Sequence, residues 1–166
     1  MLNKKQIEDI RNDFPMFKNS DSVYFDSAAT TFKQTSVIDR VNRYYTQESY
    51  NVGRSDYIAA FNVEKEVNQV RTLVADFINA EEHEIIFTAG ATASLNLIAF
   101  SYGRKHLTQG DVILTTRAEH ASNILPLFKV AEATGASIEY IELDETGQLT
   151  VDKFEEAMHD KVKVVT

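Results

Sequence analysis

The sequence predicts an α/β fold with a mostly parallel sheet, preceded by a helical N-terminal segment. From residue 84 onward, short apolar runs that are typical of strands alternate with helical stretches, at 84–88, 111–115, 137–143 and 162–165. Helices are expected between them, at 92–102, from the end of the loop 116–120 to about 133, and at 151–158. Strands that alternate with helices through short loops form parallel sheets with right-handed crossovers. At 166 residues, 43% of them hydrophobic, the chain can bury a domain core.

The first half of the chain has a different pattern, with longer helices and more polar loops. Helices are predicted over 3–13, 35–48 and 58–78, with a short strand at 23–26 that runs into a turn at 27–31. The helix over 58–78 carries an apolar stripe that we expect to face a core: Ile58, Phe61, Val63, Val67, Val70, Val74 and Phe77. We therefore divide the chain into an N-terminal segment, 1–57, and a partial large domain, 58–166.

Composition excludes several classes of function. The chain has no cysteine, which removes disulfides, thiolate nucleophiles and cysteine-based metal sites, and we expect no metal centre. A net charge of -8 without a basic run disfavours nucleic acid as a partner. No apolar run is long enough to cross a membrane, and the polar N-terminus does not resemble a signal peptide. A small-molecule partner and a cytoplasmic location are the resulting expectations.

The turn at 88–96, between a predicted strand and the next helix, is a candidate phosphate site. Amides at the start of a helix have no intrahelical acceptor, and the helix dipole places partial positive charge there. Gly90 and Ala91 would let an anion approach, and the hydroxyls of Thr92 and Ser94 could donate further hydrogen bonds. The alternative is a small-residue turn that Thr92 merely caps.

Two further candidates are a histidine and an arginine in loops. His120 follows the strand at 111–115 and could stack on a flat ring or exchange protons, or it could cap the next helix, with Ser122 and Asn123 as rival caps. Arg54 could bind a carboxylate or phosphate through its planar fork, or lie on the surface as a solvated charge. The other histidines, at 83, 106 and 159, lie in polar surroundings and are assigned no role.

These candidates occur in the order of a known family. Tyr24-Phe-Asp-Ser-Ala-Ala-Thr-Thr31 resembles the "YLDNAATT" opening of class V aminotransferases, and the stretch from Phe77 through Asn96 is similar to the family's approach to its phosphate turn. Glu119-His-Ala-Ser-Asn-Ile-Leu-Pro126 is similar to the "EHHANIVPW" segment of Suf-type cysteine desulfurases and selenocysteine lyases. The resemblance covers the chain nearly end to end. It implies a PLP-dependent transferase fold (fold type I), with pyridoxal 5'-phosphate (PLP) as cofactor.

The resemblance also implies roles for individual residues. Ala91 and Thr92 would bind the PLP phosphate, while His120 would stack on the pyridine ring and take part in proton transfers. Two loops would lie at the substrate entrance or the interface of a homodimer, and they carry Asp26, Ser27, Ala28, Ala29, Asn51 and Arg54. The implied reaction converts L-cysteine to L-alanine and passes sulfur to an enzyme cysteine. A sulfur-acceptor protein and a place in iron–sulfur cluster assembly would follow, and a homodimer implies exposed apolar surface on the helices 35–48 and 58–78.

The sequence departs from the family pattern at several positions. At the phosphate turn, Ala91 replaces the first of two adjacent threonines. Ala93 and Ser94 then follow Thr92, where the family has Glu or His and then a small residue. Asn51-Val-Gly-Arg54 differs from the family's usual arginine loop. The family's Schiff-base lysine, its pyridine-nitrogen aspartate, its carboxylate-binding arginine and its persulfide cysteine would all follow Thr166.

The chain also ends on a predicted buried strand. We therefore expect an N-terminal fragment that is inactive by itself. The alternatives are another class V enzyme, such as a selenocysteine lyase or an aminotransferase, and a stand-alone α/β domain that binds a phosphate ligand or a partner.

Overall fold

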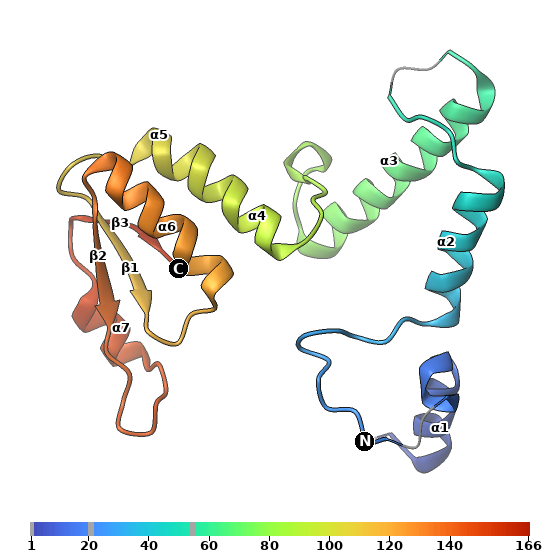
Figure 1. Cartoon of the computed structure of the whole chain (residues 1–166), viewed down its shortest axis with the longest axis horizontal. Helices are drawn as coiled ribbons and strands as arrows, with labels where there is room; N and C mark the ends of the chain where they lie inside the picture. The colour runs from blue at the N-terminus through green and yellow to red at the C-terminus, as the bar shows by residue number, and fades with distance from the viewer. Residues whose placement is uncertain (1, 20–21, 54–55) are drawn as a thin grey trace. The chain divides into compact units, whose positions relative to one another are not determined.

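The computed structural model describes residues 2–19, 22–53 and 56–166 (Figure 1). The chain forms two compact units, Met1–Ile85 and Ile86–Thr166, each described by itself below. Arg54, one of the candidate anion-binding residues, lies outside the described residues. The division into an N-terminal segment, 1–57, and a partial large domain, 58–166, stays a prediction.

The first unit is helical. Its elements are α1 (Lys4–Asn12), a 3-10 turn η1 (Pro15–Lys18), α2 (Thr35–Gln47), α3 (Ile58–Ile78) and a second 3-10 turn η2 (Glu82–Glu84). Helix α1 begins with a capping box in which Asn3 and Gln6 satisfy each other's backbone amides. Helix α3 ends at Asn79, whose left-handed backbone (φ 55°) closes the last turn. Asparagine tolerates this conformation better than most residues, which explains why the helix ends there.

Two predicted strands are wrong. Residues 23–26 are extended but pair with no strand among the described residues, and residues 84–88 contain the end of η2 followed by irregular chain. A strand is stable only when its backbone groups bond to a neighbour, and an apolar run does not supply that neighbour. The local pattern at both places is that of a strand, but no partner strand is present in the part of the chain that the structure describes.

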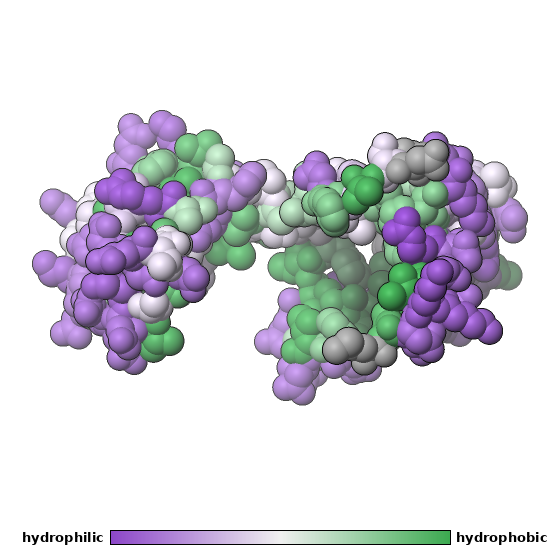
Figure 2. Space-filling view, turned by 90° about the horizontal axis from the view of Figure 1, so that it is seen from below, coloured by the Kyte–Doolittle hydropathy of each residue, from purple (hydrophilic) through white to green (hydrophobic). Residues whose placement is uncertain are grey.

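The apolar stripe predicted for α3 lies largely on its surface. Val63 is buried, but Ile58 is 81% exposed, Phe61 63% and Phe77 89%. Helix α2 likewise exposes large apolar side chains: Val37, Ile38, Val41, Tyr44 and Tyr45. Figure 2 shows hydrophobic residues, in green, on the visible face of this unit, on the right of the view. The core role predicted for the stripe is therefore wrong within this unit, whereas exposed apolar surface on both helices is confirmed.

The second unit is an α/β layer. It contains α4 (Ala91–Ile98), a π-helical turn η3 (Ala99–Gly103), α5 (Arg104–His106), β1 (Val112–Thr116), α6 (Ala121–Thr134), β2 (Ser137–Ile141), α7 (Val151–Ala157) and β3 (Val162–Val165). The strands are parallel in the order β2-β1-β3, which places β1 in the middle. The parallel sheet and the alternation of strands with helices are confirmed.

The core of this unit forms between the sheet and α6. Every residue of β1 is buried, as expected for a central strand, and Ile113 and Val130 are fully inaccessible. Ile113 packs with Leu127, Val130 and Ala131 of α6, and partly buried residues of the outer strands join this cluster. The left-handed Gly135 (φ 77°) ends α6 as predicted. With the sheet and α6 packed in this way, the loop after β1 and the start of α6 are held in fixed positions.

Candidate functional site

The predicted phosphate turn lies at the start of α4. Gly90 is the N-cap, with φ 147° and ψ 176°, a conformation that is essentially restricted to glycine. No heavy atom lies within 4 Å of the position that a Cβ would take at Gly90, so the space outside the turn is open. The first amides of α4 therefore begin at a turn that an anion can approach closely, which fits a phosphate group.

Hydrogen bonds within the turn separate the roles of its two hydroxyl side chains. The Ser94 hydroxyl lies 2.7 Å from the Thr88 hydroxyl, and Thr88 also accepts a hydrogen bond from the Gly90 amide at 3.3 Å. Ser94 therefore braces the turn from within, which corrects the expectation that it donates outward. Thr92 differs from Ser94. Its carbonyl accepts a hydrogen bond from the Asn96 side chain at 2.8 Å. Its hydroxyl makes no hydrogen bond among the described residues and remains available to a ligand.

His120 lies at the start of α6 and caps it. Its Nδ1 accepts a hydrogen bond from the Ser122 amide at 3.1 Å and lies 2.7 Å from the Ser122 hydroxyl. The imidazole ring itself remains exposed to solvent. Capping and ligand binding were alternatives in the sequence, but the structure makes them compatible because the cap occupies only one ring nitrogen.

A polar network fixes the loop that carries His120. Asn123 donates to a carboxylate oxygen of Glu119 at 2.8 Å and accepts from the Thr166 hydroxyl at 2.7 Å. Thr116, at the end of β1, accepts from the amide of Ala118 at 3.2 Å. The loop is thus bonded to the carboxyl ends of both β1 and β3, the edge at which parallel sheets bind ligands. The sequence did not predict this network, because its partners lie up to 43 residues apart.

The starts of α4 and α6 open onto the same hollow in the second unit. It has a volume of about 340 Å³ and is lined by Thr92, Asn96, Phe100, Ala121, Ser122, Leu125, Pro126 and Lys129. Thr92 of the phosphate turn and Ser122, the partner of His120, therefore lie on one surface. The structure brings together the two candidate elements that the sequence placed 28 positions apart, at Thr92 and His120.

The turn that contains Asp26, Ser27, Ala28 and Ala29 is stabilised by Tyr24. The Tyr24 hydroxyl reaches the carbonyls of Asp26, at 2.9 Å, and of Thr30, at 2.5 Å. Its ring stacks on Phe32 with a centroid distance of 4.2 Å. The amide of Ala29 closes the turn onto the Asp26 carbonyl. The turn predicted at 27–31 is therefore present, and its shape is maintained by contacts within its own segment.

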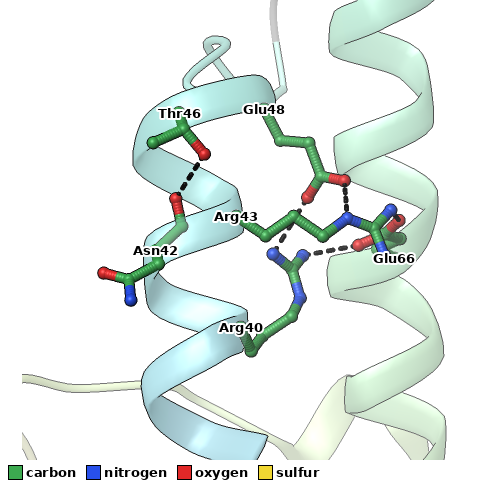
Figure 3. Close-up of polar contacts among 6 residues, drawn as sticks. All are labelled: Arg40, Asn42, Arg43, Thr46, Glu48 and Glu66. Atoms are coloured by element: carbon green, nitrogen blue, oxygen red, sulfur yellow. Dashed lines mark hydrogen bonds and ion pairs between the residues drawn. The ribbon is translucent and has the colours of Figure 1, made fainter.

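The loop that contains Asn51 begins at an ion-pair network between α2 and α3 (Figure 3). Glu48 binds Arg43 at 2.5 Å and Arg40 at 2.9 Å, and Arg40 also binds Glu66 of α3 at 2.5 Å. The contact of Arg40 with Glu48 is an ion pair that lacks the angles of a hydrogen bond. The Glu48 side chain is only 15% exposed, whereas the arginines are about half exposed. The network links the end of α2 to α3 just before the loop.

The shifted pKa values in the second unit belong to two aspartates in turns and to one lysine of α7. Hydrogen bonds from the backbone and side chain of Thr108 lower the pKa of Asp111, which lies before β1. The amide of Gln148 and the hydroxyl of Thr146 lower the pKa of Asp144. A hydrogen bond to Glu156 raises the pKa of Lys153 in α7. These groups stabilise the loops around the sheet and take no part in the hollow.

The described residues contain no candidate metal site and no candidate membrane span. No group of three or more histidines and carboxylates is arranged to hold a metal ion within residues 2–19, 22–53 and 56–166. Over the same ranges, none of the helices combines the length and the apolarity that a membrane span requires.

Comparison with known proteins identifies the family. The model of the family "Aminotransferase class-V" matches residues 23–166. This chain belongs to that family. A probable cysteine desulfurase of Synechocystis sp. PCC 6803 is 36% identical over 162 residues, which are 95% of this chain and 39% of the relative. One from Ureaplasma parvum is 47% identical over 133 residues, or 80% of this chain and 33% of the relative.

A solved structure gives the same result. The apo cysteine desulfurase of Thermococcus onnurineus NA1 has a TM-score of 0.87 and 33% identity to this class V chain. The match covers 99% of this chain and 40% of the Thermococcus protein. The partial fold-type-I domain predicted from the sequence is confirmed. This class V chain spans about two fifths of the length of these relatives or less.

Proposed function

We propose that this chain is the N-terminal part of a PLP-dependent cysteine desulfurase, which converts L-cysteine to L-alanine and passes the sulfur to a cysteine of the enzyme. One observation carries the proposal: the starts of α4 and α6 open onto one hollow, in a chain whose relatives are cysteine desulfurases along nearly its whole length. The chain itself has no cysteine, so the residue that accepts sulfur lies outside these 166 residues.

The start of α4 would hold the phosphate of the cofactor. Its unpaired amides and dipole favour a dianion there, and the glycine conformation at Gly90 leaves room for close approach. The amides of Ala91 and Thr92 and the hydroxyl of Thr92 are the donors in this proposal. Because Ala91 offers no hydroxyl, Thr92 supplies the side-chain donor at this turn. Ser94 and Thr88 maintain the shape of the turn.

His120 would cover one face of the cofactor ring. Bound PLP supplies an electron sink that stabilises negative charge developing on the substrate. The exposed imidazole can stack on such a ring, while Nε2, the nitrogen that does not cap α6, can hold or release a proton beside the substrate. The network of Glu119, Asn123 and Thr166 would hold the loop in place during that exchange.

The two loops of the first unit complete the proposal. Asp26, Ser27, Ala28 and Ala29 would lie at the substrate entrance, and Asn51 and Arg54 would belong to a loop that reaches the site at a homodimer interface. The exposed apolar side chains of α2 and α3 support such an interface. A sulfur-acceptor protein and a cytoplasmic location are also part of the proposal.

The test is the reaction of the whole protein with L-cysteine. With PLP and a reductant present, it should release equal amounts of alanine and sulfide, and Thr92→Ala should lose cofactor affinity. If selenocysteine is turned over and L-cysteine is not, the protein is a selenocysteine lyase. Amino-group transfer to a keto acid without release of sulfur would assign it as an aminotransferase. Either result overturns the proposal.

A further inference from the structure

Ser122 contacts one nitrogen of His120 with two different groups. Its amide donates to Nδ1 at 3.1 Å, and its hydroxyl oxygen lies 2.7 Å from the same atom. Ser122 is half-buried and also lines the hollow beside Thr92. The contact therefore involves a residue of the hollow that Thr92 of the phosphate turn also lines.

The two groups favour different protonation states of the ring. An amide can only donate, so it requires Nδ1 to be an acceptor, and a neutral ring then carries its proton on Nε2. A hydroxyl can donate to a bare Nδ1 or accept from a protonated one. A proton on Nδ1 leaves the Ser122 amide without its acceptor in either case, and without the hydroxyl the Nδ1 proton would have no acceptor either.

This difference decides what Nε2 can do. When a charged imidazolium releases its Nε2 proton, the neutral ring that remains carries its proton on Nδ1. The Ser122 hydroxyl accepts a hydrogen bond from that Nδ1 proton, so the ring does not have to rotate or change tautomer first. With the amide alone, the neutral ring is confined to the form with a proton on Nε2.

Three polar side chains of α6 and of the loop before it already have other partners. The Glu119 carboxylate accepts from Asn123, and Asn123 in turn accepts from Thr166. Lys129, at another part of the hollow, pairs with Glu132 at 3.0 Å. The similar segment "EHHANIVPW" has alanine at the position of Ser122, so the hydroxyl is a feature of this chain and not of that motif.

We propose that Ser122 is a positioning residue that gives Nδ1 of His120 a hydrogen-bond partner in both protonation states, so that Nε2 can gain and lose a proton while the ring stays in place. The inference rests on the proposed function for the role of His120 in the reaction. The hydrogen bonding itself does not depend on that function and can be tested separately.

The first experiment is spectroscopic. Solid-state ¹⁵N NMR of the whole protein, labelled at histidine, reports which ring nitrogen carries the proton, and His120→Gln assigns the signals. Ser122→Ala keeps the amide and removes the hydroxyl, so the neutral form with a proton on Nδ1 should disappear from its spectra. Ser122→Thr should restore it. Identical His120 signals in the wild type and Ser122→Ala would overturn the inference.

The second experiment is kinetic. Ser122→Ala should reduce kcat by about threefold to tenfold, the equivalent of one hydrogen bond, with KM and PLP affinity unchanged. Ser122→Thr should recover most of the rate. The control is Ser101→Ala, which removes a hydroxyl whose one hydrogen bond among the described residues goes to the Leu97 carbonyl, and it should leave kcat unchanged. If the protein is an active desulfurase, an unchanged kcat in Ser122→Ala contradicts the inference. If the protein does not turn over cysteine but shows the predicted NMR change, only the proposed function is rejected.

Discussion

The hydroxyls of Thr88 and Ser94 lie 2.7 Å apart across the turn that begins α4. This pair bonds within the turn, whereas the Thr92 hydroxyl is left to a ligand. The turn therefore contains two hydroxyls that bond to each other and one for which we propose a role in binding, and substitutions can separate these roles.

Thr92→Ala and Ser94→Ala should differ in which property they change. We expect Thr92→Ala to weaken PLP binding roughly tenfold, as loss of one hydrogen bond to a charged group does, and to leave stability nearly unchanged. Ser94→Ala should lower the free energy of unfolding by about 1 kcal/mol, with a smaller effect on affinity. PLP titration followed by absorbance, together with urea unfolding, measures both. Equal effects of the two substitutions on both quantities would contradict this division.

Gly90→Ala should disturb the phosphate turn through its backbone. The conformation at Gly90 is strained for any residue with a Cβ, at a cost of about 1–3 kcal/mol, although nothing would collide with the added atom. PLP affinity should fall because the turn must change shape. Gly147→Ala is the matched control, since that glycine also has a positive φ (78°) and open space but lies in a turn after β2. The control should lose stability and keep its affinity for PLP.

Asp111 should make stability depend on acid pH. Its pKa is lowered in the folded state by hydrogen bonds from Thr108, so the carboxylate stabilises the fold at pH values above the usual value of 3.8. This stabilisation is lost as the pH falls below 3.8 toward the folded-state pKa, because the protonated group accepts these bonds less well. Urea unfolding between about pH 2 and pH 6 should show a shallower acid dependence for Asp111→Asn. Asp160→Asn, at an exposed position before β3, is the control and should follow the wild type.

Glu48 should be the most sensitive member of the network between α2 and α3. Glu48→Gln removes the charge that two arginines share at a position only 15% exposed, and we expect a loss of about 1 kcal/mol. Lys4→Gln, which breaks the exposed pair with Glu8, should change stability by less than about 0.5 kcal/mol. Thermal unfolding at low and high salt tests both. A Glu48→Gln variant as stable as the wild type would show that the network contributes nothing.

The sequence predicted the elements whose causes are local. The bounds of α3 were correct at both ends, because a long periodic pattern stops at the left-handed Asn79. The strands β1 and β3 were placed within one residue, since short apolar runs between helices are distinctive. The strands at 23–26 and 84–88 were wrong, because pairing partners cannot be read from an isolated run.

The candidate site was predicted less completely. Its main candidates, Thr92 and His120, were chosen from their places after predicted strands, of which only the one before His120 is present, and their helices line one hollow. The roles of Ser94 and Ser122 were not predicted, because a hydroxyl can bond inward or outward and only the local geometry decides. A signal for Ser122 was present, since it lies two residues after His120 at a position where the similar motif has alanine.

The chain of 166 residues taken alone should not react as an enzyme. It contains no cysteine to accept sulfur, and no lysine in it matches the position of the family's Schiff-base lysine. After incubation with PLP and reduction with borohydride, peptide mapping should find no single modified lysine. A defined adduct at one position, such as Lys129 or Lys163, would contradict this expectation.

The most direct test of the central claim is the product of L-cysteine in the whole protein with PLP. We expect alanine and an equal amount of sulfur, recovered as enzyme-bound persulfide before reduction and as sulfide after it. Thr92→Ala should require more PLP for the same rate. Turnover of L-cysteine without alanine, or no turnover in protein saturated with PLP, would contradict the account.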